Sequence, residues 1–426
     1  MLAVGIFLVM GSGAAACAIR AHAGDRHRIW RDSGYRCAER KGRAPGGSRR
    51  RRSSTRALCC SGCSDEFHGG WDARVIIPET FVARMGALHG RAGEAWADGL
   101  PALLDRCATR FAVHLETSSF ANLSWNLVVR ARRRDGVSAV LKIGFSRDEL
   151  VRERRALAEF AGRGAVRVLD ADEEAGALLL ERVEPGTPLS AIEDDRLATE
   201  IFSRVFRRLH GPPFADSSLH RGGSPELARA GAGFPSIEEH FAALARYSQR
   251  FVGGVGGGGP LPGRWVERAG DALAELVSST GEGVLLHGDL HHGNILRRAG
   301  GLRTGNTLRQ HDILRRDNTL RQHDSLQRVA QERAAEWAVI DPKGIVGDAH
   351  FDVIQYLLNY PARGGDPSVV LRSRIALLAS RLGLDPSRIA QWGVARGVLE
   401  ACWSLEHGGD WGEGIRIAER FAACPV

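Results

Sequence analysis

The stretch Val284-Leu-Leu-His-Gly-Asp-Leu-His-His-Gly-Asn294 joins a short apolar run to a polar loop. The run Val284–Leu286 predicts a buried strand, and the loop after it has the spacing His-x-Asp-x4-Asn. An aspartate held on such a loop can accept a proton from a hydroxyl, and an asparagine oxygen can hold Mg²⁺. The plainer alternative is that Asp289 and Asn294 only cap turns and that His287 is a core histidine.

A second carboxylate follows another apolar run, Trp337–Ile340. Asp341 stands at the end of that predicted strand and would add an oxygen ligand for Mg²⁺, which takes few ligands from the protein and the rest from phosphates and water. Two such strand-loop units favour a phosphoryl-transfer site over the turn-capping alternative. In that site Asp289 is the proton acceptor, and Asn294 and Asp341 are the metal ligands.

Lysine is rare in this chain, which has three lysines against 55 arginines. One of the three, Lys142, stands in the apolar run Ala139–Ile143, where an exposed lysine is not expected. A compact ammonium on a flexible stem suits the α- and β-phosphates of a nucleotide, and a lysine on the third strand is the pattern of kinases. Glu149 and Glu153 follow one turn apart on a predicted helix; either could pair with Lys142, and Glu153 is favoured.

Hydrophobic periodicity predicts a β-rich region followed by a larger helical region, which is an α+β architecture. The dipeptide Asp135-Gly136 predicts a hairpin inside the β-rich region. The predicted strands of that region are 125–132, 137–143, 166–170 and 177–183, and the predicted helices of the chain are 78–89, 92–111, 148–160, 192–209, 237–251, 264–279, 351–359, 369–382 and 389–407.

These motifs together resemble the aminoglycoside phosphotransferase family, and within it the branch of streptomycin 6-kinases and hydroxyurea kinases. The resemblance covers about residues 75–426. It implies a protein-kinase-like fold of two lobes with ATP and Mg²⁺ bound between them. The segments that carry it are Leu286–Leu296, Ile340–Gly344, Gly347-Asp348 and Phe351–Val353.

The resemblance also implies roles for residues outside the two loops. Adenine would lie on backbone near Glu181 to Val183, while His287 and Asp352 would support the catalytic loop without touching substrate. The usual glycine-rich phosphate loop is absent, because residues 113–135 contain no glycine. Polar side chains, Ser119 among them, would bind the phosphates instead.

Charge and cysteine are distributed unevenly along the chain. The net charge is +8, and residues 1–70 hold 13 Lys and Arg against 5 Asp and Glu, so residues 71–426 are neutral. We therefore expect no nucleic-acid binding by the folded body. Five of the eight cysteines also lie in 1–70. The remaining three cannot form a disulfide framework, which indicates a cytoplasmic protein. We also expect no membrane partner.

Four segments are predicted from these patterns. Residues 1–70 are a basic, disordered tail, 71–183 an N-terminal lobe with leading helices, and 184–426 a helical C-terminal lobe. Within the last, Asn306–Asp312 recurs as Asn318–Asp324, which predicts a polar surface insertion over 299–335. The His-Asp pair in each copy could instead ligate a metal, but a duplicated loop is favoured.

Acidic residues near the C-terminus are candidates for binding a cationic acceptor. Streptomycin-like molecules carry guanidinium groups, which form charge-assisted hydrogen bonds with carboxylates. Glu406 and Asp410 are predicted for this role, since they follow Glu400 and Trp403 within a short stretch. The alternative is a solvated acidic face with Trp403 in the core.

We therefore predict an ATP- and Mg²⁺-dependent O-phosphotransferase that acts on a hydroxyl of an aminoglycoside such as streptomycin. A kinase for hydroxyurea or another small metabolite is the alternative within the same chemistry. A protein kinase is disfavoured because the glycine-rich loop, His-Arg-Asp and Ala-Pro-Glu are absent. A nucleotide-binding protein without catalysis is disfavoured because the lysine, both aspartates and the asparagine are present.

Overall fold

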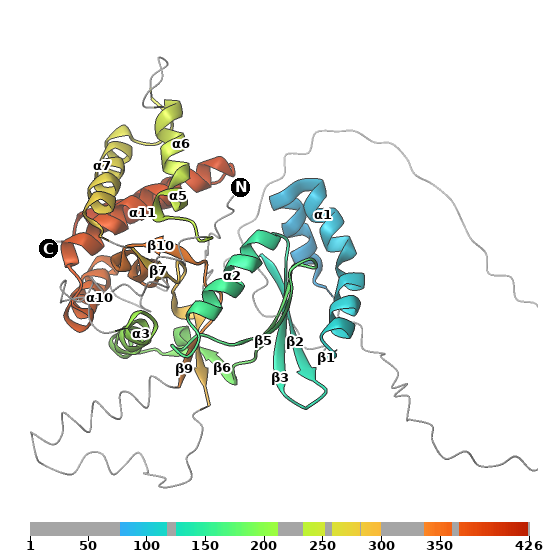
Figure 1. Ribbon diagram of the computed structural model, residues 1–426. Helices are drawn as coiled ribbons and strands as arrows, with labels where there is room; N and C mark the ends of the chain where they lie inside the picture. The colour runs from blue at the N-terminus through green and yellow to red at the C-terminus, as the bar shows by residue number, and fades with distance from the viewer. Residues whose placement is uncertain are drawn as a thin grey trace, which may run out of the picture. The chain divides into compact units, whose positions relative to one another are not determined.

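The computed structural model describes residues 77–116, 125–211, 233–251, 258–281, 283–299, 336–359 and 366–424 (Figure 1). All of these belong to one compact unit of the chain. A β-rich region is followed by a helical region, so the predicted α+β architecture is confirmed. The predicted tail, Ser119 and the insertion other than Ala299 lie outside the described residues.

An antiparallel sheet with the strand order β1-β2-β3-β5-β4 forms the β-rich region. The hairpin predicted at Asp135-Gly136 joins β2 to β3, and Gly136 has a φ of 82° that a larger residue would adopt only with strain. The short strand β1 was not among the predicted strands. The strands are β1 (Val113–Leu115), β2 (Asn126–Arg133), β3 (Ser138–Gly144), β4 (Val168–Asp172) and β5 (Ala177–Glu181).

Helices cover both faces of this sheet. On β5, Ala177 and Leu179 belong to one apolar core and Leu178 and Leu180 to another, because successive side chains of a strand point to opposite faces. The first core includes residues of α1 (Glu79–Arg110) and the second includes residues of α2 (Arg147–Glu159). Figure 1 shows the two helices on opposite sides of the strands.

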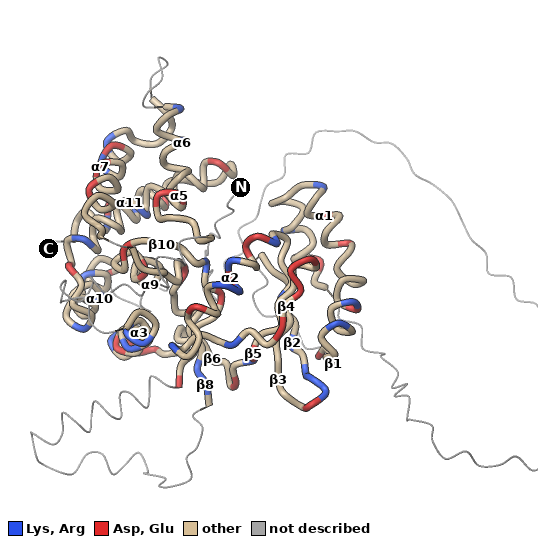
Figure 2. The backbone as a smooth tube through the Cα atoms, in the orientation of Figure 1, with Lys and Arg blue, Asp and Glu red and all other residues tan. Residues whose placement is uncertain are grey.

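The helical region is organised around α11, which is buried along most of its length and packs against α7 and α12. Figure 2 shows acidic and basic residues interspersed along its helices. The helices are α3 (Asp195–His210), α5 (Ile237–His240), α6 (Ala242–Phe251), α7 (Gly263–Ser279), α9 (Ile354–Leu358), α10 (Pro367–Leu382), α11 (Pro386–Glu406) and α12 (Gly412–Ala422), with short 3₁₀ turns η1 (Leu189–Ala191), η3 (His292–Asn294) and η4 (Ala349–Val353).

Helix α12 was not predicted, because it starts with Gly412-Glu-Gly414, a sequence typical of loops. Its glycines serve a close approach to α11. A Cβ atom on Gly414 would lie 2.4 Å from the backbone nitrogen of Ala401, and one on Gly397 would lie 2.6 Å from that of Ala418. Tertiary packing therefore overrides the low helix propensity of glycine here.

Two small sheets hold the segments that carry the sequence motifs. Strand β7 (Val284–Leu286) pairs antiparallel with β10 (Ile345–Gly347), and β8 (Ile295–Arg298) pairs antiparallel with β9 (Trp337–Val339) and with β6 (Pro185–Pro188). The loop between β7 and β8 and the loop between β9 and β10 are therefore fixed side by side. Among the described residues, no helix is both long and apolar enough to cross a lipid bilayer.

Candidate active site

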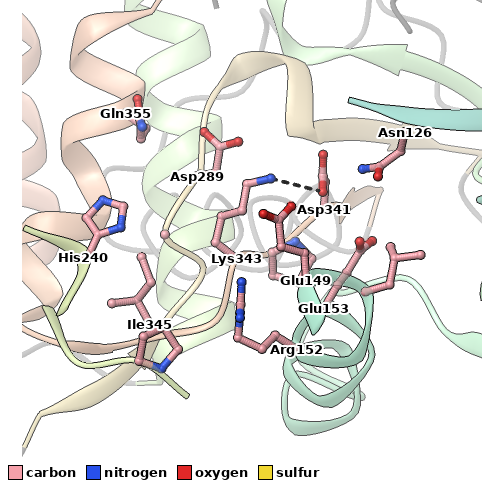
Figure 3. Close-up of a pocket in the computed structure, with 14 residues that line it drawn as sticks. Asn126, Glu149, Arg152, Glu153, His240, Asp289, Asp341, Lys343, Ile345 and Gln355 are labelled. Carbon is pink, nitrogen blue, oxygen red and sulfur yellow. Dashed lines mark ion pairs between the residues drawn. The ribbon is translucent and has the colours of Figure 1, made fainter. Parts of the chain in front are cut away.

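A pocket lies where the two loops face helix α2 (Figure 3). It is lined from both the β-rich and the helical regions, and it brings together Asp289 and Asp341 with the α2 glutamates that were considered as partners of Lys142. Its lining residues are Asn126, Glu149, Leu150, Arg152, Glu153, Pro235, His240, Gly288, Asp289, Asp341, Pro342, Lys343, Ile345 and Gln355.

The buried carboxylate of Asp352 holds the catalytic loop from behind. Its Oδ1 accepts a hydrogen bond from the backbone N–H of Gly288 at 2.7 Å, and its Oδ2 accepts one from the N–H of His287 at 2.9 Å. Nε2 of His210, at the end of α3, lies 2.8 Å from Oδ2. Burial works against the charge, but these hydrogen bonds, that of His210 foremost, lower the pKa of Asp352. The residue is therefore an ionised anchor outside the pocket lining.

The ring of His287 ties the two loops together. Its Nδ1 accepts a hydrogen bond from the backbone N–H of Asp289 at 3.3 Å, so the proton belongs on Nε2, which donates to the carbonyl of Ile340 at 3.0 Å. Burial lowers the pKa of His287, which keeps the ring neutral in this bridging tautomer.

The carboxylate of Asp289 points into the pocket (Figure 3), and its side chain is 14% exposed. Asn294 fixes the loop that carries it, because Nδ2 of Asn294 donates to the backbone carbonyl of Asp289 at 2.9 Å. The same Nδ2 lies 3.5 Å from Oδ2 of Asp289. Asp289 is thus oriented toward the cavity but retains carboxylate oxygen for an incoming hydroxyl.

Lys142 joins the β-rich region to the second loop. Its Nζ donates to Oε2 of Glu153 at 2.6 Å and to Oδ1 of Asp341 at 2.8 Å, and its side chain is only 6% exposed. Burial would lower the pKa of Lys142, but the two carboxylates, Asp341 foremost, raise it. Of the two glutamates left open by the sequence, Glu153 is the one that lies against this lysine.

Asp341 has the chemistry expected of a ligand for a hard cation. Its backbone φ of 62° is left-handed, a conformation that aspartate tolerates better than most residues. Burial opposes its charge, but Lys142 and then Lys343 hold the pKa of the carboxyl well below its usual range. The amide nitrogen of Asn294 is used on Asp289, so its amide oxygen remains for a cation.

This donor set fits Mg²⁺ with phosphates. Among the described residues, no three His, Cys, Asp or Glu side chains gather as a metal site. Mg²⁺ does not require such a cluster, because one or two protein oxygens together with substrate phosphates and water complete its octahedron. Asp341 and Asn294 are the residues that would hold it here.

Several pocket residues, Lys343, His240 and Gln355 among them, were not singled out from the sequence. Lys343 follows Asp341 by two residues, with its Nζ 3.8 Å from Oδ1 of Asp341. The rarity of lysine, which drew attention to Lys142, is the signal that could have found it. His240 and Gln355 belong to helices α5 and α9, and no spacing in the sequence connects these short helices to the motif loops.

The ring of His240 lies edge-on against Phe241, Phe351 and Trp403, with centroids 5.3–5.9 Å away. Its Nε2 is buried and has no hydrogen-bond partner among the described residues. Burial, assisted by the charges of Arg396 and Lys343, lowers the pKa of His240 to about 3. A neutral polar nitrogen therefore borders the pocket.

The depressed pKa of His240 predicts a loss of stability in mild acid. Below pH 6.5 the unfolded chain binds a proton on this histidine and the folded chain does not, so the free energy of unfolding falls as the pH falls from 6.5 toward 3. One proton contributes at most about 1.4 kcal/mol per pH unit. In His240→Gln, urea unfolding at pH 7, 6 and 5 should show a shallower decline.

His114, which is exposed on β1, provides the matched control for this measurement. His114→Gln should keep the pH slope of the parent protein. A slope equally steep in the His240→Gln variant and in the parent would mean that other groups cause the acid sensitivity.

The remaining predicted site residues lie apart from the pocket lining. Glu181 forms ion pairs with Arg298 at 2.8 Å and Arg167 at 3.3 Å, close to the buried Val183. Their backbone role toward adenine stays a prediction. Ser119 lies outside the described residues.

The two predicted acceptor carboxylates also have other partners. Oε1 of Glu406 accepts hydrogen bonds from Nε and Nη2 of Arg246 at 3.0 and 2.8 Å. Oδ1 of Asp410 accepts one from the backbone of Gly412 at 2.8 Å. Trp403 is buried, as the alternative reading of an acidic face with a core tryptophan expected. The acceptor role of Glu406 and Asp410 stays a prediction, and the structure does not bring them to the pocket.

Known proteins with a similar sequence show which family this chain belongs to. A family model described as aminoglycoside/hydroxyurea antibiotic resistance kinase matches residues 113–408, which include both loops and Lys142. The chain belongs to this family. The predicted kinase-like fold and phosphotransferase activity are thereby confirmed, and the kinase acts on a small molecule with a nucleotide as phosphoryl donor.

Two relatives in sequence of this antibiotic resistance kinase support the same assignment. The streptomycin 6-kinase of Streptomyces griseus is 32% identical over 337 residues, which cover 78% of this chain and 92% of that protein. The hydroxyurea phosphotransferase of Kitasatospora aureofaciens is 28% identical over 338 residues, which cover 79% of this chain and 82% of that protein. Among solved structures, a macrolide 2'-phosphotransferase type I matches with a TM-score of 0.45 and 18% identity over 76% of this chain and 96% of its own.

Proposed function

We propose that this kinase transfers the γ-phosphoryl group of ATP to a hydroxyl of streptomycin or a similar aminoglycoside and thereby inactivates the antibiotic. The observation that carries the proposal is that Asp289 and Asp341 line one pocket and are held by Asn294 and by Lys142, although the last of these comes from a different region of the chain. The streptomycin 6-kinases among the relatives support the choice of acceptor.

Each of these residues is proposed to have a separate role in nucleotide binding or catalysis. Lys142, held by Glu153, binds the α- and β-phosphates, and the backbone from Glu181 to Val183 receives adenine. Asp341 and Asn294 would hold Mg²⁺, which would supply positive charge against the phosphates. Asp289 accepts the proton of the acceptor hydroxyl as its oxygen bonds to phosphorus and ADP departs. Ser119 is proposed to bind phosphate where a glycine-rich loop is usual.

The cationic acceptor is proposed to bind between Glu149 on one wall of the pocket and His240 and Gln355 on the other (Figure 3). Glu149 is half-buried on α2 and, unlike Glu153, makes no ion pair with Lys142. A guanidinium group of the acceptor would find a carboxylate there, across the cavity from Asp289 (Figure 3). Neutral His240 and Gln355 add hydrogen-bonding groups without adding repulsive charge.

Two sets of carboxylates can be compared directly by kinetics. Glu149→Gln should raise KM for streptomycin about tenfold, since a charge-assisted hydrogen bond contributes about 1.5–3 kcal/mol when made and less when partly solvated. KM for ATP should stay within about twofold. The double variant Glu406→Gln, Asp410→Asn is the matched comparison. A rise in the acceptor KM of the double variant alone would place the acceptor at the end of α11.

A panel assay tests the proposed function. The purified full chain is incubated with ATP and Mg²⁺ and with streptomycin, other aminoglycosides or hydroxyurea, and products are identified by mass spectrometry. We expect a phosphate ester of streptomycin. Phosphorylation of hydroxyurea alone would favour the second candidate, which the hydroxyurea phosphotransferase among the relatives supports. ADP release without any phosphorylated acceptor would contradict both.

We also propose that the kinase acts in the cytoplasm, where ATP is available. The three cysteines of the described residues, Cys107, Cys402 and Cys424, are buried free thiols, which agrees with a reducing compartment.

A further inference from the structure

The catalytic loop of this kinase contains no lysine or arginine for the transferred group, although Nε2 of His291 lies 3.8 Å from Oδ1 of Asp289. Residues 287–294 contain neither Lys nor Arg, and Lys142 is bound to the carboxylates of Glu153 and Asp341. During phosphoryl transfer, negative charge spreads over three equatorial oxygens of the phosphoryl group. A site that performs this reaction needs a positive group beside the proton-accepting aspartate.

Lys343 occupies the position where such a group is needed. It lines the pocket together with Asp289, and Figure 3 shows its side chain reaching between Asp289 and Asp341. Its side chain is 36% exposed, against 6% for Lys142. The 3.8 Å separation of its Nζ from Oδ1 of Asp341 is longer than a hydrogen bond, which leaves the ammonium donors for a phosphate oxygen.

The backbone of Lys343 is fixed to the catalytic loop itself. Its N–H donates to the carbonyl of His287 at 2.7 Å. Gly288, with a φ of 77°, lets the lysine stem pass close by, since a Cβ on that glycine would lie 3.2 Å from Cβ of Lys343. The backbone of Lys343 is therefore fixed in position relative to the loop that carries Asp289, as preorganised transition-state stabilisation requires.

We propose that Lys343 is a catalytic residue whose ammonium binds the oxygens of the γ-phosphoryl group during its transfer. The acceptor oxygen forms a bond to the γ-phosphorus while the bond from that phosphorus to the β–γ bridging oxygen breaks. ADP departs with the electron pair, and the hydroxyl proton goes to Asp289. This inference rests on the proposed phosphotransfer and adds a residue to it.

Nucleotide binding provides a test that does not depend on turnover. Calorimetry measures the Kd of Mg²⁺-ADP with and without aluminium fluoride, which takes the place of the transferring phosphoryl group. We expect Lys343→Met to bind Mg²⁺-ADP within about threefold of the parent and to lose about 100-fold of the tightening that aluminium fluoride gives. Its kcat should fall by about the same factor.

Two other variants complete the comparison. Lys41→Met removes a lysine from the predicted tail by the same substitution and should match the parent in both measurements. Lys343→Arg keeps the charge and should retain part of the tightening. Thermal unfolding of each variant shows whether it is folded.

Each result bears on the proposal in a defined way. An unchanged effect of aluminium fluoride in Lys343→Met would overturn it, and so would an equal loss of affinity for ADP alone, which would indicate a role in the ground state. If the parent phosphorylates no acceptor, the proposed function fails, but the calorimetric comparison still decides the role of Lys343.

Discussion

Replacing Asp289 by asparagine is expected to lower kcat for phosphoryl transfer by about 10³-fold, within the range that general-base catalysis contributes. The amide has nearly the size of the carboxylate, so the loop should keep its geometry, with Asn294 still bonded to the backbone carbonyl of residue 289. The variant cannot accept the hydroxyl proton. The Kd of Mg²⁺-ATP, measured by calorimetry, should change by less than about threefold, because Asp289 is not a proposed nucleotide ligand.

The matched control for this experiment is Asp135→Asn in the exposed β2–β3 hairpin, where asparagine before glycine also suits the turn. This control should retain the kcat of the parent. A kcat for Asp289→Asn within a few-fold of the parent would remove Asp289 from the role of proton acceptor.

Removing the carboxylate of Asp352 is expected to have the largest effect on stability. In Asp352→Ala, the buried N–H groups of His287 and Gly288 and the ring of His210 would all lose their acceptor. Leaving the partners of a buried charge unpaired typically costs about 3–5 kcal/mol. Urea unfolding should show a loss of that size in the free energy of unfolding, and kcat should fall because the catalytic loop is no longer anchored.

Asp170→Ala provides the comparison, since this carboxylate forms an exposed ion pair with Arg110 at 3.3 Å. Exposed pairs contribute about 0–1 kcal/mol, so this variant should remain close to the parent. A similar small loss in Asp352→Ala would show that water or a rearranged loop replaces the carboxylate.

The parts of the fold that the sequence predicts are those with a local signal. Long amphipathic helices such as α3 and α7, and the β2–β3 hairpin with its Asp-Gly turn, follow from periodicity and turn chemistry. The elements that were missed are short or depend on distant partners. Strand β10 has three residues and exists through its pairing with β7, and α12 depends on close packing against α11.

The candidate site also contains residues that have a local sequence signal and residues that only tertiary packing brings to the pocket. Asp289, Asn294 and Asp341 could be predicted because each follows an apolar strand at a characteristic spacing, and Lys142 because a lysine in an apolar run requires a reason. His240 and Gln355 could not, since only the packing of α5 and α9 beside the loops brings them to the pocket. The position of Glu149 on the pocket wall likewise depends on how α2 faces the second loop.

The pairing of β8 with β9 makes the geometry of the proposed metal ligands independent of the number of residues that connect the two strands. Ile295 opposite Val339 and Leu296 opposite Ala338 close the connection before residue 299, so Asn294 and Asp341 keep their positions whatever number of residues joins the strands. The connection between β8 and β9 is therefore a suitable site for the insertion of another domain. A reporter domain with adjacent termini could replace the connecting residues there, one short strand pair away from Asn294 and Asp341, without a fusion at either end of the enzyme.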